Sequence, residues 1–291
     1  MQFFPIYLDT TQTAVLVVGG GEAATRKVEL MLKTAAKVTV VSPQLSPALT
    51  QLHQQNHINH IAGTYQKSQL KDKQLVFVAA DDNELNKIIR EDARHSAVLV
   101  NVVDSPTHCD FITPSIVDRS PLTFAICSEG QSPVLVRYWR ARLEALVPQG
   151  LGLVARFAGE KRQQVRQLLD SITKRRNFWE HFFSSKRSED LEQAKILFDQ
   201  LIGQQDNDQP VKGELYVVTA PDHPDFLTLV ALRNMQKADI ALYDNTVSPL
   251  VLELIRRDSE RELVDDQNIE AKIDTYIKQG LRVCYLSTKP K

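Results

Sequence analysis

Three consecutive glycines, Gly19–Gly21, restrict the fold of this chain more than any other feature of its sequence. They follow a short β-branched run, Thr13–Val18, and precede an amphipathic segment, Glu22–Lys33, with helical spacing. A strand that ends in glycines and leads at once into a helix is typical of α/β folds. The helix is expected to bury Ala24, Val28 and Leu32 and to hold Arg26, Lys27, Glu29 and Lys33 mostly outside that face.

Apolar runs alternate with longer amphipathic segments through the first hundred residues. Further strand candidates are Lys37–Val41, Gln74–Ala80 and Ala97–Val103, and a helical stretch runs from about Asn83 to His95. Continuous apolar strands separated by helices indicate a parallel sheet that is covered on both faces. The predicted fold class is therefore α/β, with a Rossmann-like doubly wound parallel sheet.

The pattern changes after the last of these strands. Two apolar runs, Phe111–Val117 and Leu122–Cys127, flank a turn sequence and predict a β-hairpin. The spacing is helical from Ser132 to about Gln200, and the polar run 204–210 is typical of a linker. A strand at 213–220 then begins a second α/β unit, so we expect more than one domain.

Residues Gly19 to Ala24 fit the pattern G-x-G-x-x-A at a strand-to-helix junction. The first glycine allows a tight turn, the second lets the backbone approach a pyrophosphate, and the small Ala24 lets the helix pack closely. The motif predicts dinucleotide binding, although a glycine-rich turn can also be only a turn. No acidic residue follows at the usual ribose position, where Ser42 can bond a ribose hydroxyl instead. No arginine lies beside Ser42 to favour a 2′-phosphate, so NAD is preferred over NADP.

Asp104 follows the strand candidate Ala97–Val103, in the segment Asn101–Pro106. Ligands in open α/β sheets bind outside the carboxyl ends of the strands, so Asp104 is expected to face the cofactor cleft. The alternative is that Asp104 caps a turn before Pro106. Asp81 and Asp82, after the preceding strand, leave the same choice open between a cofactor contact and a helix cap.

Composition excludes several classes of protein. A count of 35 Lys and Arg against 36 Asp and Glu gives a net charge of −1, so no basic field indicates nucleic-acid binding. Apolar stretches such as Leu75–Ala80 are far shorter than the ~20 residues that span a bilayer, and the amino terminus lacks a signal-peptide pattern. We therefore expect a cytoplasmic protein with neither a membrane nor a nucleic acid as partner.

The candidate metal ligands outside Asp104 are weak. Three cysteines are too few and too scattered for a disulfide framework or a CxxC metal site. His53, His57 and His60 have helical spacing, but the helix is expected to end among them, which favours exposed polar surface. His108 and Cys109 follow Asp104 closely and can approach a metal, but a loop histidine and a buried cysteine are the favoured interpretation.

Three segments resemble the amino-terminal half of bacterial siroheme synthases and the stand-alone precorrin-2 dehydrogenase/sirohydrochlorin ferrochelatases. They are VLVVGGGEAATRKVELML, NVVDSPTHCDFITPSIVDRSPLTFAICSEGQSPVL and RRNFWEHFF, and the resemblance covers about residues 1–200. It implies a homodimer that oxidises precorrin-2, a tetrapyrrole, to sirohydrochlorin with NAD and then inserts ferrous iron to give siroheme. The implied parts are an NAD-binding Rossmann domain at 1–112, a β-rich dimerisation segment at 113–147 and a helical domain at 148–203.

The same resemblance implies roles for individual residues. Those implied to bind NAD are Gly19, Gly21, Glu22 and Ala23, with a second contact at Pro43 and Gln44 beside Ser42. Asp104 is implied to be catalytic in both reactions and to hold the iron briefly, and Ser128 to face the substrate. The substrate carboxylates need cationic partners. Candidates, each of which can also be only a surface charge, are Arg119, Arg137, Arg140 and Lys174–Arg176.

Residues 213–291 resemble the start of the methyltransferase half of siroheme synthase, most clearly in LTLVALRNMQKADIALYDNTVS. Asp244 matches a proposed base, but Ala220–His223 replaces the family's glycine-rich loop and Asp266 replaces its catalytic lysine. Such a partial α/β methyltransferase lobe cannot hold its substrates in reactive geometry, so no methyltransferase activity is expected. Whether the lobe folds is open, because half an α/β lobe exposes apolar faces.

The sequence leaves two alternatives to the bifunctional enzyme. One is a dehydrogenase without chelatase activity, since a single aspartate is implicated in both reactions. The other is a non-catalytic NAD-binding sensor, which the degenerate carboxyl-terminal part suggests. The intact glycine turn and Asp104 argue against decay of the amino-terminal half.

Overall fold

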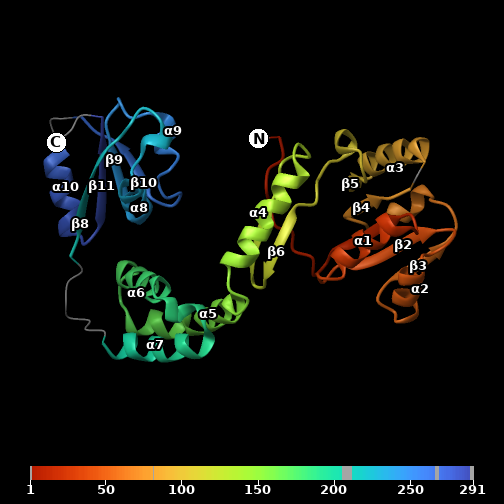
Figure 1. The fold of residues 1–291 in the computed structure, drawn as a ribbon, viewed down its shortest axis with the longest axis horizontal. Helices are drawn as coiled ribbons and strands as arrows, with labels where there is room; N and C mark the ends of the chain where they lie inside the picture. Colours follow the sequence, from red (N-terminus) through yellow and green to blue (C-terminus); the bar gives the residue numbers. More distant parts are fainter. Residues whose placement is uncertain (1, 81, 205–211, 266–268, 289–291) are drawn as a thin grey trace. The chain divides into compact units, whose positions relative to one another are not determined.

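The computed structural model describes residues 2–80, 82–204, 212–265 and 269–288 of the chain (Figure 1). Asp81, Asp266 and most of the predicted linker lie outside the described residues. The chain divides into two compact units, residues 1–118 with 123–147 and residues 119–122 with 148–291. Within the described ranges, no helix is both long enough and apolar enough to cross a bilayer.

The first unit is built on a five-stranded sheet with the strand order β3-β2-β1-β4-β5. Every pair of neighbouring strands is parallel, and Val18 at the end of β1 lies opposite both Val41 and Val78. The carboxyl ends of the strands therefore share one edge. The strands are β1 Ala14–Val18, β2 Lys37–Ser42, β3 Asn59–Ala62, β4 Leu75–Val78 and β5 Leu99–Val102.

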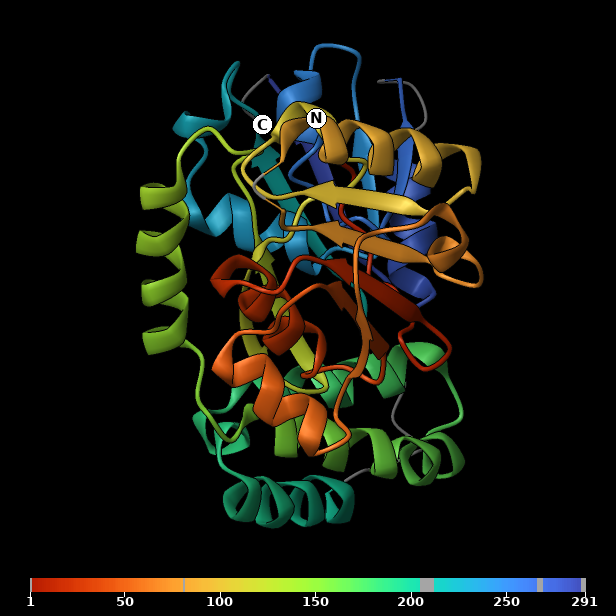
Figure 2. The same cartoon turned by 90° about the vertical axis from the view of Figure 1, so that its right-hand side faces the viewer.

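Helices cover both faces of this sheet (Figure 2). Leu16 of β1 belongs to the apolar cluster under α3, Asn83–His95, whereas its neighbour Val15 belongs to the cluster under α1, Glu22–Met31, and α2, Pro47–Gln54. Both side chains are completely buried, as expected for a central strand between two layers. The predicted doubly wound fold is confirmed.

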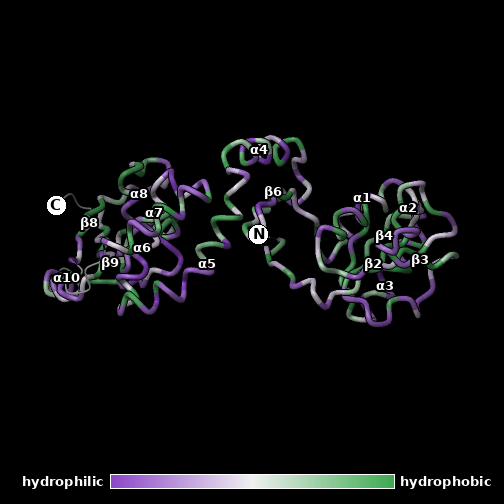
Figure 3. Tube along the Cα trace, turned by 90° about the horizontal axis from the view of Figure 1, so that it is seen from below, coloured by the Kyte–Doolittle hydropathy of each residue, from purple (hydrophilic) through white to green (hydrophobic). Residues whose placement is uncertain are grey.

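A hairpin and one long helix complete the first unit. β6, Ser115–Arg119, pairs with β7, Leu122–Ile126, in a two-stranded sheet whose tip belongs to the second unit. The hairpin predicted from the two apolar runs is thus confirmed. α4, Pro133–Leu146, has no buried residue, and its chain trace mixes apolar with polar segments (Figure 3). Its exposed apolar side chains are Val134, Leu135, Tyr138, Trp139 and Leu146.

The second unit begins with three helices around an aromatic core. They are α5, Leu151–Leu168, α6, Ile172–Ser184, and α7, Leu191–Gly203. Phe182 and Phe198 are completely buried, and the core also contains Phe157, Phe178 and Trp179. The helical prediction for this part of the chain is therefore confirmed.

The residues from Glu214 onward form a small parallel α/β lobe with the strand order β10-β9-β11-β8. Apolar clusters pack on both sides of its sheet, so this segment has its own core. The lobe is therefore folded in the structure, although its sequence left this open. Its elements are β8 Glu214–Thr219, α8 Leu229–Lys237, β9 Ile240–Tyr243, α9 Pro249–Leu252, β10 Glu260–Leu263, α10 Ile269–Lys278 and β11 Arg282–Ser287.

Candidate active site

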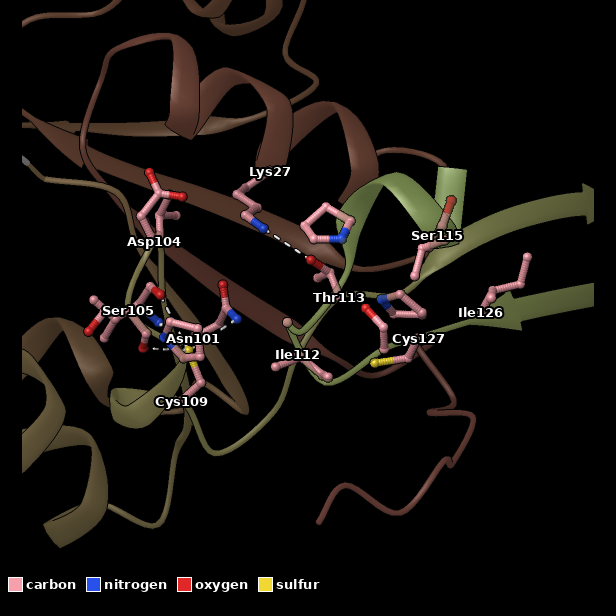
Figure 4. Close-up of a pocket in the computed structure, with 18 of the residues that line it drawn as sticks. Lys27, Asn101, Asp104, Ser105, Cys109, Ile112, Thr113, Ser115, Ile126 and Cys127 are labelled. Carbon is pink, nitrogen blue, oxygen red and sulfur yellow. Dashed lines mark hydrogen bonds between the residues drawn. The ribbon is translucent and has the colours of Figure 1, made fainter. Parts of the chain in front are cut away.

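A pocket of about 510 Å³ lies in the first unit, where the loop after β5 meets the hairpin and the start of α4 (Figure 4). Asp104, Ser105 and Cys109 lie on one side in this view, and Ile126 and Cys127 lie on the other. The polar and charged side chains that line it are Lys27, Asn101, Asp104, Ser105, Thr113, Ser115, Ser128, Arg137 and Arg140.

The glycine turn after β1 is held tightly by its neighbours. Gly19 has φ +124°, and a Cβ placed there would lie 2.3 Å from the carbonyl oxygen of Ala79. A Cβ on Gly20 would lie 1.9 Å from the carbonyl oxygen of Gln44. These two positions therefore accept only glycine, because any side chain would displace the backbone of the loops after β4 and β2.

Gly21 differs from the other two glycines because a Cβ there would meet nothing within 4 Å. It is the N-cap of α1, and no side chain caps the helix. The first amide groups of a helix lack intrahelical partners and carry a partial positive charge. An open approach to such a terminus fits a phosphate group, so the residues present suit a dinucleotide.

The loop after β2 lies beside this turn. The Ser42 side chain is buried, with 3% of the residue exposed, and its hydroxyl donates to the carbonyl oxygen of Gln44 at 2.8 Å. The hydroxyl is therefore bonded within its own loop, and a contact between Ser42 and the cofactor ribose stays a prediction. Pro43 and Gln44 are exposed. Glu22 is exposed as well and pairs with Arg26 at 3.3 Å.

Asp104 lies at the carboxyl end of β5 and lines the pocket. Its φ of +58° is a left-handed conformation, which aspartate tolerates better than most residues at a cost of ~1 kcal/mol or more. Among the described residues, nothing donates a hydrogen bond to its carboxylate, so Asp104 does not cap the turn before Pro106. The carboxylate is available to a ligand.

The glycine turn and Asp104 lie at the same edge of the sheet. β4 pairs with β1 on one side and with β5 on the other, in parallel register. Strands are spaced by about 4.8 Å, so the end of β5 lies roughly 10 Å from the end of β1. The change of strand order between β1 and β4 marks the point where open α/β sheets bind their ligands.

Lys27 is a pocket residue that the sequence analysis placed outside the buried face of α1. Its Nζ donates to Thr113 Oγ1 at 3.1 Å and lies 5.5 Å from the ring centroid of Phe77. Figure 4 shows the side chain extending from α1 toward Thr113. The available signal was its spacing, because Lys27 follows the buried Ala24 by three residues and therefore borders the buried face.

Burial lowers the pKa of Lys27, because desolvation disfavours the ammonium form. The nearby Cys109 and Asp104 oppose part of this effect. Burial also raises the pKa of the Cys109 thiol, which donates to the backbone of Val102 and Ser105 at 3.3 Å. Cys109 is therefore a packed thiol, but it is only partly buried, whereas the favoured prediction was a buried cysteine.

The remaining predicted substrate contacts divide between the two units. Ser128, Arg137 and Arg140 line the pocket, where Ser128 Oγ accepts from the amide of Ser132 at 3.1 Å. Arg119 and Lys174–Arg176 belong to the second unit and do not line the pocket. Arg176 there pairs with the buried Asp239 at 2.6 Å, so its charge has a structural partner.

The weaker candidates take the structural roles that the sequence also allowed. Asp82 caps α3 by accepting from the amides of Glu84 and Leu85. Across the described ranges, no three His, Cys, Asp or Glu side chains are grouped to hold a metal ion. In the carboxyl-terminal lobe, the Asp244 carboxylate accepts from the amide of Thr246 at 2.8 Å.

Two family models match the chain. One, described as "Putative NAD(P)-binding", matches residues 6–115 and includes both the glycine turn and Asp104. The other, described as the sirohaem synthase dimerisation region, matches residues 150–202. The second match coincides with α5–α7, whereas the predicted dimerisation segment 113–147 lies before it.

Siroheme synthases are similar to nearly the whole chain. A siroheme synthase of Pseudoalteromonas atlantica is 45% identical over 267 residues, which are 90% of this chain and 58% of that protein. A siroheme synthase of Nitrosospira multiformis is 42% identical over 305 residues, covering 98% of this chain and 64% of that protein. The chain thus spans about three fifths of the length of these curated relatives.

A solved structure has a similar fold. It is SirC, a precorrin-2 dehydrogenase, with a TM-score of 0.57 and 22% sequence identity. The match covers 68% of this chain and 98% of that chain.

The two outer glycines of the turn are expected to respond differently to alanine. Gly19→Ala should lower the free energy of unfolding by roughly 2 kcal/mol or more, because it adds a clash to a left-handed backbone. Gly21→Ala should cost less than about 1 kcal/mol, because its Cβ enters open space at an N-cap. Urea unfolding followed by circular dichroism measures both. Equal destabilisation by the two variants would contradict the described turn.

Proposed function

Because the chain is homologous to siroheme synthases over 90% of its length, we propose that it oxidises precorrin-2 to sirohydrochlorin with NAD. The observation that carries this proposal is the shared sheet edge. The open helix terminus at Gly21 and the available carboxylate of Asp104 both lie there, beside a pocket that α1 helps to line. This arrangement suits one ligand with phosphates and a second ligand next to it.

The cofactor would be held by the turn and by the loop after β2. Gly19 and Gly20 keep the turn close to the sheet, while Gly21 and the first turn of α1, with Glu22 and Ala23, present backbone amides to the pyrophosphate. The exposed Pro43–Gln44 segment is the second proposed contact. NAD, when bound, supplies the hydride acceptor.

Asp104 is the proposed general base. Removal of two hydrogens from precorrin-2 sends a hydride to the oxidant and releases a proton, which a nearby carboxylate can accept. The Asp104 carboxylate is exposed to the pocket and has no hydrogen-bond donor among the described residues, so it is free to do this. Ser128, on the opposite loop, is proposed to contact the substrate.

Ferrous iron insertion into sirohydrochlorin is the proposed second reaction of the same pocket. Iron enters as a substrate and displaces protons from the pyrrole nitrogens. Asp104 can accept the two protons one after the other and release each to solvent, and its oxygen can ligate the divalent ion briefly. The alternatives are a dehydrogenase that leaves chelation to another enzyme and a non-catalytic NAD-binding sensor.

Asp104→Asn is expected to reduce precorrin-2 oxidation by about 10²–10⁴-fold, because general-base catalysis contributes that much. Asparagine keeps the shape of the side chain and also tolerates the left-handed backbone, so the fold should persist. Anaerobic assay of NADH formation measures the rate, and NAD binding should be unchanged. An undiminished rate in the folded variant would remove Asp104 from the mechanism.

The same anaerobic assay separates the alternatives when ferrous iron is added to the wild-type chain. Siroheme formation supports both reactions, accumulation of sirohydrochlorin supports the dehydrogenase alone, and NAD binding without NADH formation supports the sensor. A control arm with uroporphyrinogen III and S-adenosylmethionine should give no methylated product. The loop Ala220–His223 lacks the glycines that would let its backbone approach the methyl donor.

A homodimer is the proposed assembly, with α4 in its interface. The helix has no buried residue in the single chain, and Leu135, Tyr138 and Trp139 are about half exposed. Phe4 and Tyr7 expose further apolar surface, and Tyr7 Oη donates to the carbonyl oxygen of Thr123 in the hairpin at 3.0 Å. Exposed apolar side chains of this kind mark a protein contact, and the dimerisation match at 150–202 supports a second copy as the partner.

Leu135→Glu is expected to convert the dimer to a monomer, because it buries a charge in the proposed apolar contact. Sedimentation equilibrium at micromolar concentration measures the change. The matched control Ile88→Glu places the same charge at an exposed apolar position of α3, outside both α4 and the matched region 150–202, and should leave the dimer intact. Ile172→Glu instead tests the matched region, at an exposed apolar position of α6. Dissociation by Ile172→Glu alone would move the interface from α4 to the helical segment.

A further inference from the structure

The charges that line the pocket do not balance. Its lining residues, all of which are described, include three cations and a single carboxylate, Asp104. Arg140 has its own partners, because its Nε donates to the carbonyl oxygen of Ile116 at 3.1 Å and its guanidinium pairs with Glu144 at 3.3 Å. Lys27 and Arg137 have no ion-pair partner in the described part of the chain. The pocket is therefore built for an anionic ligand.

Lys27 is the better fixed of these two cations. Its Nζ is held by Thr113 Oγ1 at 3.1 Å and by the face of Phe77, whose ring is completely buried. An ammonium group has three donors, and Thr113 takes one of them. The ammonium therefore keeps donors for a ligand oxygen.

The surroundings of Lys27 make an anionic partner favourable. Burial lowers the pKa of this ammonium, which shows that its environment penalises an unpaired charge. Removing a cation from water is costly unless an opposite charge compensates it. A carboxylate on the ligand would supply a direct ion pair, which no described residue forms with Lys27, because Asp104 only opposes part of the pKa shift.

Lys27 also connects the two proposed ligands. It lies six residues after Gly21, so the helix that would hold the pyrophosphate at its terminus presents Lys27 to the pocket about one and two-thirds turns later. A contact between Lys27 and the second ligand would therefore fix that ligand relative to the cofactor through one rigid element.

We propose that Lys27 binds one carboxylate of the tetrapyrrole substrate and that Thr113 orients the ammonium for this contact. The inference rests on the proposed function, because that function supplies a polycarboxylate ligand. Arg137, on α4, is the second cation available to the same ligand. Two cations on separate elements restrict how the macrocycle can rotate, and thereby determine which of its carbons faces Asp104.

Lys27→Met tests this role, because methionine keeps much of the length and apolar contact of lysine but removes the charge. The affinity for sirohydrochlorin, measured by absorbance titration, should fall about tenfold or more, and KM for precorrin-2 should rise similarly. The affinity for NAD should not change. Lys27→Arg should restore most of the binding, and Lys33→Met, at an exposed position after the same helix, should behave as the wild type does.

The outcomes distinguish a failure of the role proposed for Lys27 from a failure of the proposed function. Unchanged sirohydrochlorin affinity in folded Lys27→Met would overturn the role of Lys27 while leaving the proposed function intact. A wild-type chain that neither binds sirohydrochlorin nor oxidises precorrin-2 would overturn both. If Lys27→Met does not fold, Thr113→Val replaces it, with a several-fold loss of affinity expected and an unchanged affinity contradicting the inference.

Discussion

The close approach of Gly19 and Gly20 to the loops after β4 and β2 is the constraint on which the rest of the site depends. A carbonyl oxygen lies where each Cβ would be, so α1 must begin directly at the edge of the sheet. That start leaves Gly21 open at the helix terminus and directs Lys27, further along α1, into the pocket. These two backbone contacts thus fix the positions of both proposed ligand-binding elements.

The pairing of the buried strands also fixes the position of Asp104 relative to the glycine turn. β1 lies between two apolar layers and pairs in parallel with β2 and β4, so a shift of one strand would disturb both cores. β5 is held in the same sheet by its parallel pairing with β4, and the left-handed backbone at Asp104 turns the chain where the strand ends. Such strain is commonly found at functional sites. The single carboxylate of the pocket is therefore held by the fold rather than by hydrogen bonds to its side chain.

Sequence patterns predicted the features that depend on local periodicity and on glycine. The doubly wound sheet, the hairpin and the helical segment followed from apolar runs and turns, and Asp104 followed from its place after a strand. Lys27 was missed because its spacing from Ala24 places it at the border of the buried helix face but does not show that the side chain reaches a pocket. The basic cluster at Lys174–Arg176 does not line the pocket. Its Arg176 pairs with Asp239, 63 residues later, and spacing cannot show such a contact.

The central claim is that one edge of the sheet binds a dinucleotide and a tetrapyrrole together. A crystal structure of the chain with NAD and sirohydrochlorin tests this claim most directly. The account predicts the pyrophosphate at the start of α1 beside Gly21, and the macrocycle in the pocket between Lys27 and Asp104. A nucleotide bound elsewhere, or a macrocycle outside this pocket, would contradict it.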